Sequence, residues 1–274
     1  MKVRRFFLHS VALGMAVTFI LPGASVALAE GTLPLEVTAA GKSLSVADAA
    51  TLDASGIEAF VNGTVAPQVD IDPIDATRKV NASRRRIEFT APVNGWELDR
   101  AASVTAIAQE LARRDAQAEK TAQTVSLPGG AHAPSVTGFD KSLLVVLKER
   151  RIYLYDNAAV VKKYSCAIGM TRYPTPTGTF TIKRKVKNPS WNNPGGAWGK
   201  GLPKYIKPGP SNPLGTRALY LYRNGGDSGV RFHGTSNTGS IGRAASHGCL
   251  RMRRADVEKF YSLVPVGTTV YIIK

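Results

Sequence analysis

Cysteine is nearly absent from this chain. Among 274 residues only Cys166 and Cys249 carry a thiol. A small secreted domain held together by disulfides would carry more of them. Cys166 lies in an apolar run, residues 164–168, and is interpreted as a buried, inert thiol. Cys249 lies among histidines and arginines, so it is the thiol with candidate chemistry, and a disulfide that would silence it is not expected.

Long apolar runs are also scarce. After the N-terminal segment, no run is long enough to cross a bilayer. Residues 1–29 combine a positive start, an apolar stretch and a small-x-small pattern ending at Ala29, which is typical of a cleaved export signal. An uncleaved membrane anchor is the alternative, but the apolar stretch is short for a span. We therefore expect the mature protein to be exported through the membrane, into the cell wall or the extracellular or periplasmic space.

Acidic residues are rare in the C-terminal half. Residues 141–274 hold 23 Lys and Arg against 5 Asp and Glu, whereas residues 30–140 hold 10 against 15. So abrupt a change in the sign of the net charge along the chain predicts two domains. In an exported protein the basic half suits an anionic polymer such as the cell wall. Nucleic acid is a poor alternative, because no nucleic-acid-binding motif is present.

Apolar periodicity divides the chain in the same way. Residues 30–120 predict a small α+β domain, with strand character at 33–37 and 87–89 and with helical spacing from Val104 to Ala112 that begins near Asp99. Residues 121–140 are broken by Pro and Gly and are interpreted as a linker. From residue 141 onwards, short apolar runs alternate with turns, and only residues 255–264 are typical of a helix. This half predicts a mostly β, sandwich or barrel-like domain with few helices.

A long segment of the β half has no regular period. Residues 187–216 are rich in Pro, Gly, Asn and Trp, which is typical of a lid or a binding loop. Its aromatic residues Trp191, Trp198 and Tyr205 are candidates for substrate binding. They would serve equally well to pin the loop to the domain.

Three residues suited to catalysis lie within 17 positions, namely His233, His247 and Cys249. A free thiol is mostly protonated at neutral pH, so a nearby imidazole that takes its proton would create the attacking thiolate. Gly248 lets the backbone pass closely, so amides around Cys249 could form an oxyanion hole. A zinc site is the chemical rival, but no Asp or Glu lies between Asp227 and Asp256 to support one. We expect neither a metal nor a cofactor.

The order of these residues carries a family resemblance. His-Gly-Thr at 233–235, followed by Ser-His-Gly-Cys-Leu-Arg at 246–251, resembles the signature of the L,D-transpeptidase (YkuD-type) catalytic domain. The resemblance covers about residues 141–274 and includes the turn at 174–178 and the segment 212–215. More diffusely, residues 61–63, 75–76, 87–89 and 95–99 resemble a peptidoglycan-binding domain that often precedes it. A folded spacer is the alternative for this first domain.

The resemblance implies a role for each residue of the motif. Cys249 would attack the peptide carbonyl between a diamino acid and D-alanine in a stem peptide, with His233 as base and then acid. The Gly234 carbonyl would orient the imidazole, and His247 and Gly248 would shape the oxyanion site. The remaining implied residues bind substrate or hold the motif together; they are Ser246, Thr235 and Arg251, although some relatives carry Asn at the position of Arg251.

The same resemblance implies the reaction and its partners. Peptidoglycan stem peptides would serve as donor and acceptor, D-Ala would leave, and a thioester would be resolved by an amine into a 3→3 cross-link. Carbapenem-type β-lactams would act as inhibitors. Resolution by water instead would make the protein an L,D-carboxypeptidase or a cysteine endopeptidase. A sortase is disfavoured because its Thr-Leu-x-Thr-Cys motif is absent. A non-catalytic wall-binding protein would not need the intact His and Cys set.

Overall fold

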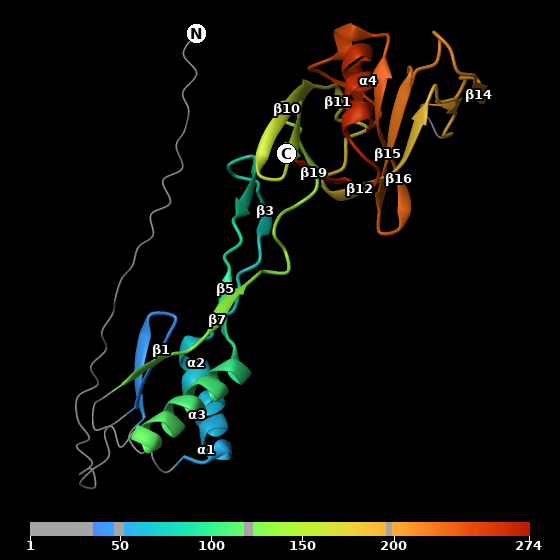
Figure 1. Ribbon diagram of the computed structural model, residues 1–274. Coiled ribbons are helices and arrows are strands. Elements are labelled where there is room, and N and C mark those ends of the chain that lie inside the picture. Colours follow the sequence, from blue (N-terminus) through green and yellow to red (C-terminus); the bar gives the residue numbers. More distant parts are fainter. Residues whose placement is uncertain (1–34, 47–51, 118–122, 196–198) are drawn as a thin grey trace, which may run out of the picture. The chain divides into compact units, whose positions relative to one another are not determined.

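The computed structural model describes residues 35–46, 52–117, 123–195 and 199–274. The expected export signal and Trp198 lie outside these residues. The chain divides into two compact units, one made of residues up to 75 together with 92–135, the other of residues 76–91 together with 136–274. The chain therefore passes between the units three times. The helices and strands of both units are labelled in Figure 1.

The first unit combines a small sheet with helices. Strand β1 pairs antiparallel with β2 and parallel with β6, and β5 pairs with β7. Its elements are β1 (Leu35–Ala39), β2 (Lys42–Val46), α1 (Ala54–Phe60), the π-helix η2 (Val61–Val65), α2 (Ala66–Val69), β5 (Gly95–Leu98), α3 (Arg100–Gln117), β6 (Thr124–Ser126) and β7 (Gly129–His132). Strands β6 and β7 thus lie within the segment that the sequence suggested as a linker.

A core of its own holds the first unit together. Ile107 of α3 is fully buried and packs with Leu35, Val37 and Val61. The predicted start of α3 is confirmed, because Asp99 Oδ1 accepts a hydrogen bond from the Ala102 amide at 3.0 Å, which satisfies one unpaired donor of the first turn. The predicted helix around Val104 and Ala112 extends over the whole of α3.

The second unit is dominated by one sheet of eight strands. The order is β10-β9-β8-β19-β12-β15-β16-β18. The unit's elements are β3 (Thr77–Asn81), β4 (Arg86–Thr90), β8 (Ser142–Val146), β9 (Arg151–Asp156), β10 (Ala159–Ser165), β11 (Ile168–Gly169), β12 (Gly178–Lys187), β13 (Trp191–Asn192), β14 (Tyr205–Ile206), β15 (Arg217–Arg223), β16 (Gly226–Thr235), the 3₁₀-helix η4 (Thr238–Ser240), β17 (Ala244–Ser246), β18 (Leu250–Arg253), α4 (Arg254–Leu263) and β19 (Thr269–Ile273).

The two edges of this sheet come together. Ala167, just beyond the end of β10, forms an antiparallel bridge with Arg251 of β18, the strand at the opposite edge. The Ala167 amide donates to the Arg251 carbonyl at 2.8 Å, and the Arg251 amide donates to the Ala167 carbonyl at 3.0 Å. The sheet is therefore nearly closed, and the predicted mostly β, barrel-like class with few helices is confirmed.

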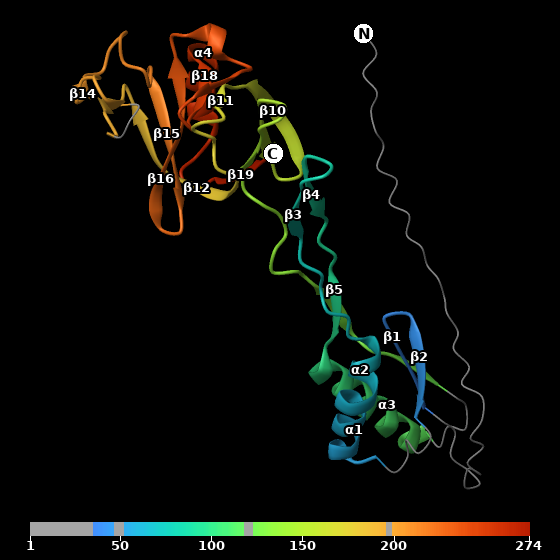
Figure 2. The same cartoon turned by 180° about the vertical axis from the view of Figure 1, so that it is seen from behind.

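Alternation along the strands separates the core from the outer face. Leu219 and Leu221 of β15, Phe232 of β16, and Leu250 and Met252 of β18 are all fully buried in one hydrophobic cluster. Helix α4, which lies against β15, β16 and β18 (Figure 2), adds Val257 and Phe260 to this cluster. Because successive side chains of a strand point to opposite faces, the residues between these positions point to the outer face.

Strand β8 departs from this alternation because both of its faces are covered. Leu143 and Val145 belong to the interior cluster, whereas Leu144 and Val146 pack with Ile87 of a hairpin formed by β3 and β4. This hairpin, residues 77–90, belongs to the same compact unit as β8 although residues 92–135 intervene in sequence. The continuous apolar run that predicted a strand here is explained by burial on both sides.

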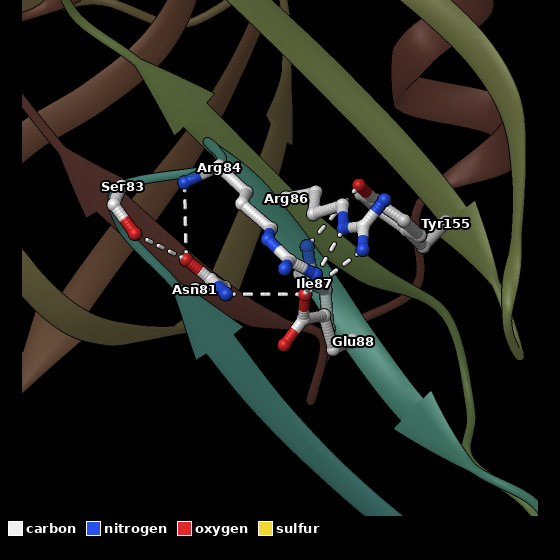
Figure 3. Close-up of polar contacts among 7 residues, drawn as sticks. All are labelled: Asn81, Ser83, Arg84, Arg86, Ile87, Glu88 and Tyr155. Atoms are coloured by element: carbon white, nitrogen blue, oxygen red, sulfur yellow. Dashed lines mark hydrogen bonds and ion pairs between the residues drawn. The ribbon is translucent and has the colours of Figure 1, made fainter.

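Polar contacts fix the turn of the β3–β4 hairpin. Asn81 Oδ1 accepts hydrogen bonds from Ser83 Oγ at 2.8 Å and from the Arg84 amide at 3.0 Å (Figure 3). Glu88 Oε1 accepts hydrogen bonds from Asn81 and from the guanidinium groups of Arg84 and Arg86. These contacts lower the pKa of the Glu88 carboxyl, and the Asn81 hydrogen bond is the largest cause. The Ile87 amide donates to Tyr155 Oη of β9 at 3.3 Å, so the hairpin is also tied to the sheet.

The other sequence predictions for this unit hold in outline. The predicted hairpin around residues 156–157 is formed by β9 and β10, and Asn157 has φ +50°, as a tight turn requires. The helix expected at 255–264 is α4. Among the described positions of residues 188–216, the strands are the short pair β13 and β14. Within the part of the chain that the structure describes, no helix is both long and apolar enough to cross a membrane.

Candidate active site

The predicted nucleophile and base lie on neighbouring strands. Strands β16 and β18 are parallel, with Phe232 opposite Leu250 and His233 opposite Arg251. Because Phe232 and Leu250 point into the core, His233 and Arg251 project from the outer face. Cys249 immediately precedes β18 and, by the same alternation, projects from that face too. The fold therefore brings the Cys249 thiol and the His233 imidazole to one surface of the sheet.

The thiol of Cys249 is half-buried and forms no disulfide. Its Sγ donates a hydrogen bond to the carbonyl oxygen of Gly229, 3.6 Å away. Burial raises the pKa of this thiol, while the charge and hydrogen bonds of Arg231 and the charge of Arg251 act in the opposite direction. Cys166, in contrast, is fully buried, and burial raises its pKa to about 12. The interpretation of Cys166 as a buried thiol is confirmed.

The imidazole of His233 is held by its own strand. His233 is only 4% exposed, and its Nδ1 lies 2.7 Å from the carbonyl oxygen of Gly234. A carbonyl oxygen can only accept, so Nδ1 carries the hydrogen and Nε2 is left as the basic atom. Burial lowers the pKa of His233 to about 4, against the opposing effect of this hydrogen bond.

These two shifts determine the resting charges of the pair. With its pKa near 4, the His233 imidazole is neutral at pH 7, and with a raised pKa the Cys249 thiol is protonated. At pH 7 the resting site thus holds a neutral thiol and a neutral imidazole. Such a pair can ionise during attack, when a substrate closes the site to water.

The turn before Cys249 is closed by internal hydrogen bonds. Ser246 Oγ donates to the Cys249 carbonyl at 2.6 Å and accepts from the Gly248 amide at 3.2 Å. Gly248 has φ +104°, a conformation that other residues rarely adopt. The expectation that Ser246 bonds within its own motif is therefore matched by the geometry, and glycine is required at 248 by the backbone.

A second turn supports this one from outside the motif. Thr175 Oγ1 donates to the Gly248 carbonyl at 2.9 Å and accepts from the Gly169 amide at 2.8 Å. Gly169 has no room for a side chain, because a Cβ there would lie 2.3 Å from the Tyr173 carbonyl oxygen. The family resemblance included the turn at 174–178, but it implied no role for Thr175.

His247 is arranged differently from His233. It is exposed, and its ring lies 4.8 Å from the Tyr173 ring at an interplanar angle of 47°. Burial, followed by the nearby charge of Arg251, lowers the pKa of His247. The side chain thus lies at the surface, against the Tyr173 ring.

The residues after His233 serve mainly to fix the backbone. The Gly234 amide donates to the Leu214 carbonyl at 3.1 Å, and the buried Thr235 Oγ1 accepts from the Asn237 amide at 3.1 Å. Thr235 therefore closes a turn rather than facing a ligand. Asn212, which is 3% exposed, anchors the adjoining loop by donating to the carbonyls of Pro189, Ile206 and Lys207 and accepting from the Leu214 amide.

Arg251 is half-buried opposite His233, in the register of β16 and β18. Its backbone forms the bridge to Ala167 that closes the sheet, so its side chain emerges where the two edges meet. Its charge lowers the pKa of the Cys249 thiol, though less than Arg231 does. The sequence named Arg251 but gave no role to Arg231, which the alternation of β16 could have placed on the face of His233.

The aromatic residues of the 187–216 segment divide between two settings. Trp191 of β13 is 9% exposed and pairs with Ile206 of β14, so it helps to fix the segment. Tyr205 of β14 is 55% exposed and is accessible to a ligand.

In the described residues, no cluster of three or more His, Cys, Asp or Glu side chains is arranged to hold a metal ion.

Fold and site together define a class: a nearly closed β domain that presents a thiol and an imidazole on the outer face of adjacent parallel strands. The family profile described as YkuD, L,D-transpeptidase catalytic domain, matches residues 140–272. The YkuD protein of Bacillus licheniformis is 31% identical over 150 residues, which cover 55% of this chain and 74% of that protein. The chain belongs to the L,D-transpeptidase family of the YkuD type.

Other relatives match a smaller share of their own length. The ErfK/SrfK protein of Escherichia coli strain K12, a probable L,D-transpeptidase, is 33% identical over 141 residues, covering 48% of this chain and 44% of that protein. The chain thus spans less than half of this relative. Among solved structures, an Enterococcus faecium L,D-transpeptidase aligns over 89% of this chain and 96% of that protein's chain, at 14% identity and a TM-score of 0.43.

Proposed function

We propose that this protein is an exported L,D-transpeptidase that forms 3→3 cross-links in peptidoglycan, with Cys249 as nucleophile and His233 as base. The observation that supports it best is the register of β16 and β18, which sets His233 opposite Arg251, with Cys249 directly before β18, in a chain of this family. The neutral resting pair is suited to a substrate that must first bind before the thiol is activated.

The first half of the reaction forms an acyl-enzyme. Nε2 of His233 takes the thiol proton as Sγ of Cys249 attacks the carbonyl between the diamino acid and D-Ala of a donor stem peptide. The C–N bond then breaks, and His233 returns the proton to the leaving amine of D-Ala. A thioester between the stem peptide and Cys249 remains. The Gly234 carbonyl keeps Nδ1 protonated and thus keeps Nε2 available.

The second half transfers the acyl group to an amine. The side-chain amine of a neighbouring stem peptide attacks the thioester carbonyl, and Nε2 of His233 takes its proton. The C–S bond breaks, the new amide is the cross-link, and Cys249 regains its proton from His233. The Gly248 amide already donates to Ser246 Oγ. In both halves we therefore assign the negative oxygen of the tetrahedral intermediate to the Cys249 amide, in the turn that Ser246 and Thr175 hold in place.

The distribution of charge suits the proposed location. Residues 141–274 carry a net charge of +18 from 23 basic and 5 acidic side chains, which favours binding to an anionic wall. We place the protein outside the membrane on the basis of the export signal at 1–29. The first unit has a core of its own, and we assign it the binding of peptidoglycan strands.

One experiment tests the enzymatic proposal. The purified protein is incubated with a stem tetrapeptide, and products are separated by liquid chromatography and mass spectrometry. We expect a Cys249 thioester that lacks D-Ala, followed by cross-linked dimers. Cys249→Ala is expected to abolish both, whereas Cys166→Ala retains them. Tripeptide without dimers would identify an L,D-carboxypeptidase instead, and absence of any Cys249 adduct would refute the nucleophile.

Carbapenem-type β-lactams offer a second, substrate-independent probe. Their strained amide carbonyl is an acyl donor for a thiolate, so we expect a stable adduct on Cys249. The adduct should be absent from Cys249→Ala, and it should form much more slowly in His233→Gln. An adduct on Cys166 in the folded protein would contradict the burial of that thiol.

A further inference from the structure

Arg231 lies on β16 two residues before His233 and therefore on the same outer face. Extension of the β16–β18 register from Phe232 and Leu250 sets Arg231 beside Cys249. Its side chain is only 25% exposed. An arginine at this place is not explained by the proposed roles of the Cys–His pair.

Three contacts hold the guanidinium group of Arg231 in one orientation. Its Nη2 lies 3.3 Å from Asp227 Oδ2, its Nη1 donates to the Gly229 carbonyl at 2.5 Å, and it lies 4.7 Å above the Tyr220 ring. Arg184 packs against the same tyrosine at 3.7 Å. Asp227 also fixes Gly229, because its Oδ1 accepts from the Gly229 amide at 2.9 Å.

The carbonyl of Gly229 is shared between Arg231 and the nucleophile. The thiol of Cys249 donates to this oxygen at 3.6 Å, and Nη1 of Arg231 donates to it at 2.5 Å. A carbonyl oxygen favours the protonated sulfur, because it accepts the S–H and repels a negative charge. A guanidinium group favours the ionised sulfur, because it carries donors and a positive charge.

We propose that Gly229 and Arg231 form a two-position holder for the sulfur, in which the thiol rests on the carbonyl and the thiolate on the guanidinium. Arg231 is then a positioning residue that stabilises the attacking state, and Asp227 aims it. The inference rests on the proposed function in that Cys249 is taken as the nucleophile. It adds a polar partner for the sulfur that the Cys–His pair does not supply.

Other charged and titratable groups lie on the elements around Cys249. His233 and Asp227 come from β16, Arg251 from β18 and His247 from the preceding turn. Arg251 also favours the ionised sulfur, but its effect on the thiol pKa is smaller than that of Arg231. The negative charge of Asp227 is paired with Arg231, so Asp227 acts through the guanidinium rather than directly on the sulfur.

The test measures ionisation of Cys249 without any substrate. Alkylation by iodoacetamide is followed from pH 6 to 10 by mass spectrometry of the intact protein in a Cys166→Ala background. We expect Arg231→Gln to slow alkylation at pH 7 about tenfold, which corresponds to a rise of roughly one unit in the thiol pKa. Arg231→Lys should recover part of the loss, and Asp227→Asn should lose less than Arg231→Gln.

Arg223→Gln is the matched control. It removes one guanidinium group from β15, where the Thr177 carbonyl and the Phe180 ring are the contacts made by Arg223. It should leave the alkylation profile of the parent unchanged. If the Arg231→Gln profile coincides with that of the parent, the proposal is overturned. A rise in KM with an unchanged alkylation profile would also overturn it, because Arg231 would then bind substrate.

Folding and function are kept separate in this design. Should Arg231→Gln fail to fold, Arg231→Lys and Asp227→Asn carry the test, and unchanged profiles in both would reject the holder. Alkylation needs no stem peptide, so a failure of transpeptidation leaves its result interpretable. A shifted profile in a protein without transpeptidase activity would support the holder while refuting the proposed function.

Discussion

The hydroxyl of Thr175 donates a hydrogen bond to the carbonyl oxygen of Gly248, 2.9 Å away and 73 residues later in the chain. The same hydroxyl accepts from the Gly169 amide at 2.8 Å, so one buried side chain joins two turns. The turn that precedes Cys249 is thus held from both sides, by Ser246 within the motif and by Thr175 from outside it.

Replacement of Thr175 by valine keeps the shape of the side chain but removes the hydroxyl. The Gly248 carbonyl and the Gly169 amide would lose a buried partner, at a cost of about 1–3 kcal/mol for each unsatisfied group. We expect acylation of Cys249 to slow by about tenfold to hundredfold, because the oxyanion amides lose their fixed position. Single-turnover acylation by a carbapenem measures this. Thr177→Val, at an exposed position, is the control, and equal rates in both variants would contradict the prediction.

His233 should make stability depend on pH. Burial lowers its folded-state pKa to about 4, whereas a histidine in the unfolded chain titrates near 6.5. Between these values the unfolded chain binds more protons, so the free energy of unfolding decreases as pH falls from 6.5 towards 4, by up to about 3 kcal/mol. Urea unfolding at pH 7 and pH 5 measures the decrease. It should be smaller in His233→Gln, and an equal decrease in both proteins would show that His233 is not its source.

Asn212 should be essential to the segment at 187–216. Its amide nitrogen serves three backbone carbonyls in a nearly closed site. Asn212→Ala is expected to reduce the free energy of unfolding by about 2–4 kcal/mol, because these acceptors lose their donor. Asn212→Asp keeps the size but places a carboxylate against carbonyl oxygens, so it should be at least as harmful. Limited proteolysis should cut the segment faster in both variants, but not in Asn192→Ala, which is an exposed position.

Ile87 tests the contact between the β3–β4 hairpin and the sheet. It is 4% exposed and packs with Leu144 and Val146 of β8. Ile87→Ala is expected to destabilise this unit by about 2–4 kcal/mol, from lost burial and the cavity that remains. Labelling of the buried Cys166 by a thiol reagent, in a Cys249→Ala background, reports opening of the unit and should accelerate. Thr90→Ala, at an exposed position of β4, should label like the parent. Unchanged labelling in Ile87→Ala would show that the hairpin does not stabilise the unit.

Much of the site could be predicted because its chemistry is concentrated in two short segments. His233 and Cys249 are recognisable as residue types that cooperate, and their strands are visible as alternating apolar positions. The same alternation in β16 would have placed Arg231 beside the sulfur. The roles of Thr175 and Asn212 could not be predicted, because their partners include backbone groups that come near only when distant parts of the chain fold together. No local sequence pattern encodes such contacts.

The division of the chain was harder to predict for a related reason. Residues 77–90 have the period of an amphipathic hairpin. This pattern indicates that one face of the hairpin is buried, but it does not indicate which unit that face packs against. The continuous apolar run of β8 was the relevant signal, because a strand that is buried on both faces needs a second element packed against its outer face. The hairpin supplies that cover from a distant part of the sequence. Strands β6 and β7 were missed because β6 spans only three residues and β7 begins with two glycines.

The hairpin also determines what the smallest self-sufficient catalytic piece of this protein is. A fragment trimmed to the family's boundary at residue 140 lacks residues 76–91 and leaves Leu144, Val146 and Tyr155 bare to water. We expect such fragments to self-associate through this uncovered patch in sedimentation velocity. A chain that fuses 76–91 to 136–274 should stay monomeric, and equal behaviour of the two would argue against this expectation. On this expectation, the part of the chain that keeps β8 covered is discontinuous in sequence, although the family match is continuous.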